Sequence, residues 1–256
     1  MGSDSIQALK DDYVFCYLDI LGLKQAFKDD PEKAYDYLIR FRENFLKWFG
    51  HDNSPWPKPE MEFFSDTIII YTKYDADIFD NLIDPILASV VCAFTNAIQY
   101  DFTFRGSITI GKAKKLADED GDCTGIVGPV FEEVYLLESQ LAIYPRIVLG
   151  KKLRDKIQSS TAKKWINTDM DGIDQIDIFC RAHSELLSKM NDGNDRKTKD
   201  FITEIAKKIE DKYDEHSNKN TPESLKISSK WGYLLQYLRQ SYIGEVYLNN
   251  DSSSEQ

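Results

Sequence analysis

The chain has 256 residues, of which 42% are hydrophobic and 29% are charged, a balance typical of a folded globular protein. Its formal net charge of -11 repels phosphate backbones, which argues against a nucleic-acid-binding protein. The charge does not exclude a nucleotide substrate, because a metal ion can carry phosphates past carboxylates.

The N-terminal part of the chain predicts a buried strand followed by a helix. The first residues, MGSDSIQALKDD, have no apolar core, so we expect no signal peptide. Residues 13–20, YVFCYLDI, form a mostly apolar run with Asp19 near its end, the pattern of a central strand. A helix follows, with Asp29 or Asp30 as its cap and Pro31 in its first turn. The four cysteines form no CxxC pair, which favours free thiols in the cytoplasm.

The middle of the chain predicts a hairpin, a helix and another strand. EMEFF (60–64) and TIIIYT (67–72) are separated only by Ser65 and Asp66, which indicates a tight hairpin with a carboxylate at its tip. An apolar helix over about 77–100 is interrupted by polar residues, so we expect it to fall short of a membrane span. FRGSITIG (104–111) is typical of a strand.

The remaining chain predicts one more helix and strand and then a charged segment. GPVFEEVYLLESQLA (128–142) is amphipathic, and RIVLG (146–150) is a short strand. Residues 184–230 are rich in Lys, Asp, Asn and Ser, with one charged helix near 199–213, which favours an insertion or a loosely packed appendage before a last helix, WGYLLQYLRQSY.

The order of these elements predicts an α+β protein with a ferredoxin-like βαββαβ core. We expect an antiparallel sheet with helices on one face, and extra C-terminal helices. The catalytic core would occupy residues 1–180, and residues 181–256 would hold the charged insertion and the C-terminal helices.

Two carboxylates carry the chemistry that the sequence predicts. Asp19 ends a buried strand, where an unpaired charge is costly. In a βαββαβ sheet the first strand lies beside the hairpin, so Asp66 is expected close to Asp19. Two carboxylates at one sheet edge suit Mg²⁺ or Mn²⁺, two ions per site, with nucleotide phosphates as further ligands. The segment Leu21, Gly22 and Leu23 would bring backbone N–H groups to the phosphates.

Each carboxylate also has an ordinary structural interpretation. Asp at the end of a strand is often a cap, and Ser-Asp is a common turn dipeptide. The occurrence of both, in this order of elements, favours the metal site.

The segments that carry these carboxylates resemble class III adenylate and guanylate cyclases. YLDILGL is similar to the first metal-binding strand of that family, FFSDTIII to its second metal hairpin, and FRGSITIG and GPVFEEVYLLES to the strand and helix that follow. The resemblance implies that Ile20 lends a backbone carbonyl to a metal ion bound by Asp19 and Asp66.

More specifically, the chain resembles the Pycsar-type pyrimidine nucleotide cyclases of bacterial anti-phage defence. The fragments that suggest this are YLDILG, FSDTI, RGSITIG, GPVFEEVYLLES, AIYPRIV, DMDG and KWGYLLQY, which lie in this order from residue 17 to about 237. The resemblance implies a homodimer with active sites at the subunit interface. Each site would convert UTP or CTP to the 3′,5′-cyclic monophosphate, which would activate a separate effector protein.

The sequence departs from ordinary class III enzymes on the helix after GPV. The family's ribose-binding Asn and transition-state Arg fall on Glu132 and Leu136. Leu136 cannot stabilise a developing negative charge. Arg105 or Arg146 are the candidate replacements, although each has an equal interpretation as a structural ion-pair partner.

The base-selecting positions resemble those of guanylate cyclases only in part. Glu62 lies four residues before the hairpin carboxylate, and its usual companion falls at Thr124 or Gly125. A phenyl ring following Glu62, such as Phe64, would shrink the pocket to the size of a pyrimidine, or would simply pack in the core. Glu132 would bind the ribose hydroxyls, and its neighbour Glu133 would only face solvent.

Three alternatives stay open at this stage. The chain could be a purine-specific class III cyclase, a relative of diguanylate cyclases or polymerase palms, or a degenerate domain that binds a nucleotide as a sensor. FFSDT lacks the Gly-Gly-acidic signature of diguanylate cyclases. The pair of Asp19 and Asp66 speaks against a pure sensor.

Overall fold

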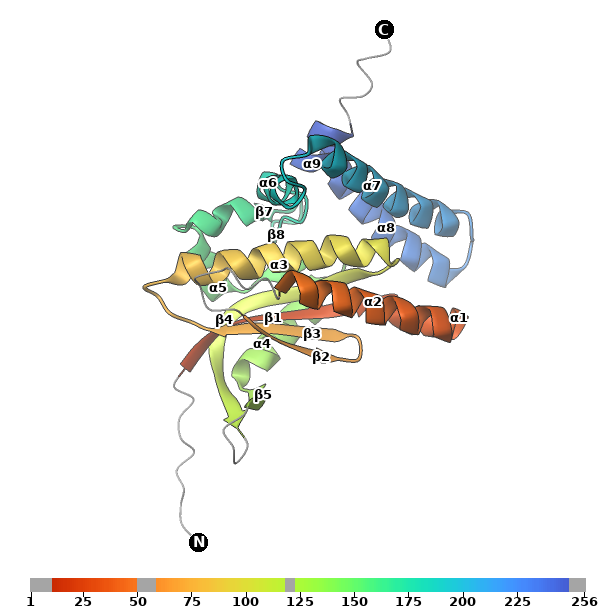
Figure 1. Ribbon diagram of the computed structural model, residues 1–256. Helices are drawn as coiled ribbons and strands as arrows, with labels where there is room; N and C mark the ends of the chain where they lie inside the picture. Colours follow the sequence, from red (N-terminus) through yellow and green to blue (C-terminus); the bar gives the residue numbers. More distant parts are fainter. Residues whose placement is uncertain (1–10, 50–58, 118–122, 249–256) are drawn as a thin grey trace.

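The computed structural model describes residues 11–49, 59–117 and 123–248, and these form an α+β fold (Figure 1). The strands are β1 (Asp11–Leu21), β2 (Glu60–Phe64), β3 (Thr67–Lys73), β4 (Thr103–Ala117), β5 (Cys123–Val127), β6 (Ile147–Leu149), β7 (Ile166–Thr168) and β8 (Asp174–Ile176). The helices are α1 (Leu23–Asp29), α2 (Pro31–Phe49), α3 (Phe79–Gln99), α4 (Pro129–Leu141), α5 (Lys151–Ile157), α6 (Arg181–Met190), α7 (Asp195–Ser217), α8 (Pro222–Gln240) and α9 (Tyr242–Tyr247), with a 3₁₀ helix at Thr161–Trp165. The predicted βαββαβ order and the extra C-terminal helices are confirmed.

The described strands form one sheet in the order β2-β3-β1-β4-β6-β8-β7, with β5 paired to β4. β1 lies between β3 and β4 and is antiparallel to both, so it is the central strand that its apolar sequence predicted. The four strands of the predicted core, β1 to β4, pair antiparallel as expected, whereas β6, which follows the core, runs parallel to β4. A parallel neighbour requires a crossover connection, and the chain that includes α4 provides it.

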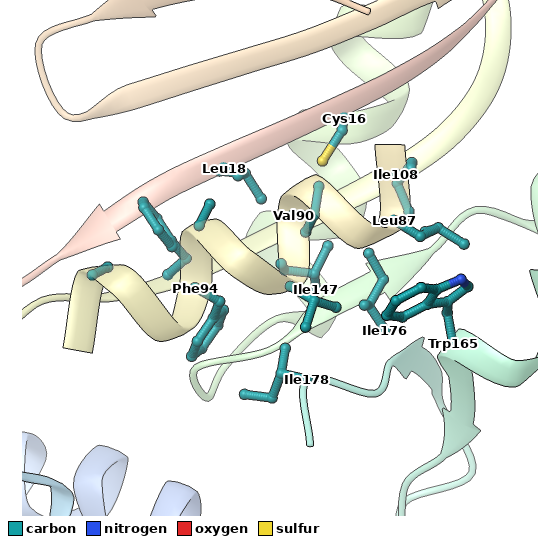
Figure 2. Packing of buried hydrophobic residues seen from close by; sticks show 14 of the residues in the cluster. Cys16, Leu18, Leu87, Val90, Phe94, Ile108, Ile147, Trp165, Ile176 and Ile178 are labelled. Atoms are coloured by element: carbon teal, nitrogen blue, oxygen red, sulfur yellow. The ribbon is translucent and has the colours of Figure 1, made fainter. Parts of the chain in front are cut away.

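The helices of the predicted core, α2 and α3, cover one face of the sheet as expected, and α4, which follows the core, covers the other. Figure 2 shows Cys16 and Leu18 of β1 packed against α3, which carries Val90 and Phe94. On the opposite face, Phe15 contacts Phe131 of α4, with ring centroids 4.5 Å apart. Figure 1 shows α4 and β5 on the side of the sheet away from α2 and α3. Because side chains alternate along a strand, β1 serves both layers.

Helix α3 is the apolar centre of the larger layer. By length and composition alone its 21 residues could cross a membrane, so the expectation that this stretch is too polar for that is wrong. However, 72% of its most apolar window is buried inside the fold. It is therefore accounted for as a core helix that packs against the sheet.

The charged C-terminal segment is a pair of regular helices rather than a loose appendage. α7 buries Ile202, Ile205 and Ile209 in the same core as α3, and α8 adds Trp231 and Leu234. The apolar residues of α7 recur at helical spacing within a charged sequence, so overall composition concealed them. α8 begins at Pro222, earlier than the predicted last helix. The division of the chain at residue 180 stays a prediction.

Candidate active site

The structure brings the two predicted carboxylates to the same end of the sheet. Asp19 pairs across strands with Thr67, the residue after Asp66. The backbone N–H of Ile20 donates to the carbonyl of Asp66 at 2.7 Å. Ser65, with φ 54°, completes the two-residue turn between β2 and β3. The hairpin tip is therefore held against the end of β1.

Asp19 lies in a partly buried, charged environment. Its Oδ2 accepts a hydrogen bond of 2.9 Å from Nε of Arg105, its cross-strand neighbour on β4. Burial raises the pKa of Asp19, the Arg105 guanidinium opposes this, and the negative charge of Asp66 raises it further. The charges of the two carboxylates thus act on each other, and a cation between them would relieve that repulsion.

A third carboxylate, Glu138 of α4, belongs to the same cluster and was missed as a site residue by sequence reasoning. Glu138 is only 2% exposed, and its Oε1 lies 2.5 Å from Nε of Arg105. This contact is an ion pair rather than a hydrogen bond, because the single N–H of Nε points to Asp19. Burial raises the pKa of Glu138 despite Arg105. Glu138 lies four residues after Val134, and this helical spacing could have indicated from the sequence that Glu138 faces the same buried side of α4.

Lys230 of α8 is a further charged group that the sequence did not single out. It is partly buried and close enough to Asp19 and Arg105 for their charges to act on it. Burial, and then the Arg105 charge, lowers the pKa of Lys230, while Asp19 opposes the shift. Only tertiary packing brings residue 230 to the end of β1.

The donor set fits a divalent cation that is completed by a ligand. Among the residues that the structure describes, no group of three or more His, Cys, Asp or Glu side chains could hold a metal ion. The protein would therefore supply only Asp19, Asp66 and a backbone carbonyl such as that of Ile20. Carboxylate and carbonyl oxygens suit Mg²⁺ or Mn²⁺, which commonly take their other ligands from water and phosphate.

The predicted phosphate-binding segment forms the turn between β1 and α1. Gly22 has φ 92°, a conformation that favours glycine, and precedes the first residue of α1. The side chains of Leu21 and Leu23 are buried. The turn thus follows directly after Asp19 and Ile20, and its contact with phosphates stays a prediction.

The residues around Glu62 lie on two faces of β2. Glu62 accepts a hydrogen bond of 2.9 Å from the Tyr71 hydroxyl. Phe63 packs against Phe45 in the core layer of α2 and α3. Phe64 is 55% exposed on the opposite face, so it is the ring of the two that is exposed to solvent beside the hairpin tip.

On α4, the predicted ribose-binding residue Glu132 faces solvent, and its neighbour Glu133 is the one that contacts the protein. Glu133, expected to face only solvent, accepts a hydrogen bond of 2.8 Å from Thr109, whereas Glu132 is exposed. Leu136 is also exposed. The side chain of Thr124 lies outside the described residues.

Arg146 serves the structure rather than the site. Its side chain is 3% exposed, and its guanidinium donates to the carbonyl of Leu141 and forms ion pairs with Asp169 and Asp171. Of the two candidate arginines, only Arg105 contacts Asp19.

No family model matches the chain, and no curated protein matches it. Solved structures of cyclases align with about two thirds of this chain. The guanylyl cyclase Cya2 is 14% identical with a TM-score of 0.47 and matches over 64% of this chain and 91% of its own. A dimeric guanylyl cyclase domain from the fungus Blastocladiella emersonii is 12% identical with a TM-score of 0.45, over 65% and 94%. Adenylate cyclases from Trypanosoma brucei are 11% identical with a TM-score of 0.48, over 69% and 94%. At these values neither an activity nor the role of any residue is carried over to this chain.

Proposed function

We propose that this protein is a nucleotidyl cyclase that converts a pyrimidine nucleoside triphosphate, UTP or CTP, to its 3′,5′-cyclic monophosphate and pyrophosphate. The observation that carries the proposal is the placement of Asp19 and Asp66 at one end of the sheet, with their charges acting on each other. The Gly22 turn, directly after Asp19, supports it as a place for the triphosphate.

In the proposed reaction the ribose 3′-oxygen bonds to the α-phosphorus, the bond to the bridging oxygen breaks, the hydroxyl proton is released and pyrophosphate leaves. Asp19, Asp66 and the Ile20 carbonyl would hold Mg²⁺ or Mn²⁺. Such ions, when bound, favour ionisation of the 3′-hydroxyl and neutralise charge at the α-phosphate. Arg105 fixes the orientation of Asp19 through its 2.9 Å hydrogen bond and places positive charge beside the reacting phosphate.

The base would lie along the hairpin and the ribose along α4. Glu62 is already oriented by the Tyr71 hydroxyl and can accept a hydrogen bond from the base. The exposed ring of Phe64 favours a small base by narrowing this space. Thr124 and Glu132 would bind the base and the ribose hydroxyls. We propose that the cyclic product acts in the cytoplasm on a separate effector in anti-phage defence, as the Pycsar resemblance implies.

We further propose that two copies of the chain pair through the outer face of α4. Tyr135 is 58% exposed, Leu136 is 42% exposed, and Ile143 just beyond the helix is 63% exposed. Large apolar side chains exposed on and just beyond one helix favour a protein partner, and a second copy gives a self-complementary interface. Leu136→Asp should shift the molecular mass measured by sedimentation from that of a dimer to that of a monomer, with Glu204→Asp at an exposed position of α7 as the control. A wild-type protein that is monomeric at micromolar concentration would contradict this interface.

A direct assay tests the activity. The purified protein is incubated with each of the four ribonucleoside triphosphates and Mg²⁺ or Mn²⁺, and products are identified by mass spectrometry. Cyclic UMP or cyclic CMP with pyrophosphate is the expected result, and cyclic GMP or cyclic AMP would establish a purine cyclase instead. No product from any nucleotide with either metal would end the proposal.

A nucleotide-binding sensor is the second candidate. It is favoured by Leu136, which is exposed where the family's arginine is expected, and by the pairing of Arg105 with two carboxylates. Saturable binding of a triphosphate without any turnover would support the sensor.

A further inference from the structure

The α7–α8 hairpin closes a cavity over the turn that follows Asp19. The cavity has a volume of about 250 Å³ and lies between α1, α2, the turn before β4, and the two C-terminal helices. Gly22 and Leu21 line it on one side, and Lys230 and Trp231 line it on the other. The end of β1 is thus bounded by a helix pair that lies far away in the sequence.

The hairpin is tied to the core at this point by ion pairs. Asp101, in the turn before β4, receives Lys208 at 2.8 Å and Lys212 at 3.5 Å, both from α7. α8 packs along α7 and buries Trp231, the residue next to Lys230. These contacts restrict where the Lys230 ammonium can lie.

Lys230 differs from Lys212, which lines the same cavity, in lacking a protein anion of its own. Lys212 pairs with Asp101 and Glu215, whereas the Lys230 ammonium makes no hydrogen bond or ion pair with any residue within 11–49, 59–117 or 123–248. It is partly buried, and the Arg105 charge disfavours its ammonium form, which the Asp19 charge offsets only in part. A partly buried ammonium with an unfavourable cationic neighbour is costly unless an anion joins it.

We propose that Lys230 binds the terminal phosphates of the nucleoside triphosphate, so that the added helical hairpin completes the polyphosphate site of the cyclase. This inference rests on the proposed function. The triphosphate would extend from the Asp19 and Asp66 end, past the Gly22 turn, to the Lys230 ammonium in the cavity. A flexible point charge with three donors suits the outer phosphates, whose charge stays with the leaving pyrophosphate.

Three variants test this inference. Lys230→Met keeps the aliphatic stem and removes the charge, Lys230→Arg keeps the charge, and Lys207→Met removes a charge from an exposed position on α7. Binding of inorganic tripolyphosphate is measured by calorimetry, and KM and kcat are measured with the preferred nucleotide. We expect Lys230→Met to weaken tripolyphosphate binding and raise KM by roughly 10- to 100-fold, as for a lost charge-assisted hydrogen bond. Lys230→Arg should recover most of the affinity, and Lys207→Met should bind like the wild type.

Wild-type affinity in Lys230→Met, or an equal loss in Lys207→Met, would overturn the inference. The two proposals fail separately. A wild type that binds tripolyphosphate through Lys230 but forms no cyclic product refutes only the cyclase. If Lys230→Met cyclises the nucleotide as well as the wild type does, only the proposed role of Lys230 is refuted.

Discussion

The two faces of β1 differ in what they contribute. Val14, Cys16, Leu18 and Ile20 belong to the core on the side of α2 and α3 and are at most 4% exposed, and Figure 2 shows Cys16 and Leu18 facing α3. The alternating residues begin with Tyr13 and Phe15 against α4 and end at Asp19, among charges. One strand therefore carries an apolar face that stabilises the fold and a face that becomes polar where the sheet ends.

This difference separates stability from activity along a single strand. Substitutions on the α3 face should cost stability, since the core there is closely packed. Substitutions at Asp19 and its neighbours should change activity more than folding, because a charged cluster that is costly to bury is retained for chemistry.

The largest expected effect is on turnover. Asp66→Asn should lower kcat by about 1,000-fold or more, because a neutral amide is a poor ligand for a divalent cation. The melting temperature should change little, since Asp66 contributes its backbone carbonyl to the fold. Product formation and thermal unfolding check both statements, with Asp211→Asn at an exposed position of α7 as the control. Full turnover in Asp66→Asn would show that the active site does not lie at this end of the sheet.

Leu18→Ala tests the other face of β1, one residue from Asp19. Leu18 is fully buried, and its truncation should lower the free energy of unfolding by about 2–5 kcal/mol. Urea titration measures the loss, and kcat of the folded fraction should stay within a few-fold of the wild type. A small stability loss with a large fall in kcat would show that the two faces are not separable.

Neighbouring phenylalanines sharpen the comparison on β2. Phe63→Ala should cost about 2 kcal/mol of unfolding free energy, since this ring packs partly buried against Phe45. Phe64→Ala should cost less than about 0.5 kcal/mol, because the ring is mostly exposed. The ratio of kcat/KM for UTP and GTP should move towards GTP only in Phe64→Ala. The same preference between UTP and GTP in both variants would contradict the placement of Phe64 in the base pocket.

The smallest effect concerns pH and Glu138. Burial raises the pKa of this carboxyl above its ordinary value of 4.5, so its ionised form costs stability at neutral pH, and this cost disappears as the pH falls to about that value. Glu138→Gln should therefore raise the melting temperature at pH 7.5, by an amount that shrinks on acidification.

Asp155→Asn provides a control of opposite sign for the pH experiment. A hydrogen bond from Lys151 lowers the pKa of Asp155, so its ionised form stabilises the fold at neutral pH and this stabilisation is lost as the pH falls. The variant should melt slightly lower than the wild type at pH 7.5. A Glu138→Gln difference that grows at acidic pH would contradict the assigned environment of Glu138.

The sequence by itself determined the local elements and the carboxylate pair. Period-two and period-3.6 patterns act over a few residues, and β2 was predicted with the bounds that the structure shows. Because a hairpin next to a central strand leaves few pairings, Asp19 and Asp66 could be expected together before any coordinates.

Only the tertiary structure decided which charges join that pair. Glu138 and Lys230 lie 119 and 211 positions after Asp19 in the chain, and no local pattern records that α4 and α8 reach the same end of the sheet. The parallel pairing of β6 and the burial of α7 likewise depend on contacts between distant segments. Such contacts are selected by the packing of the whole core, which a short window of sequence does not contain.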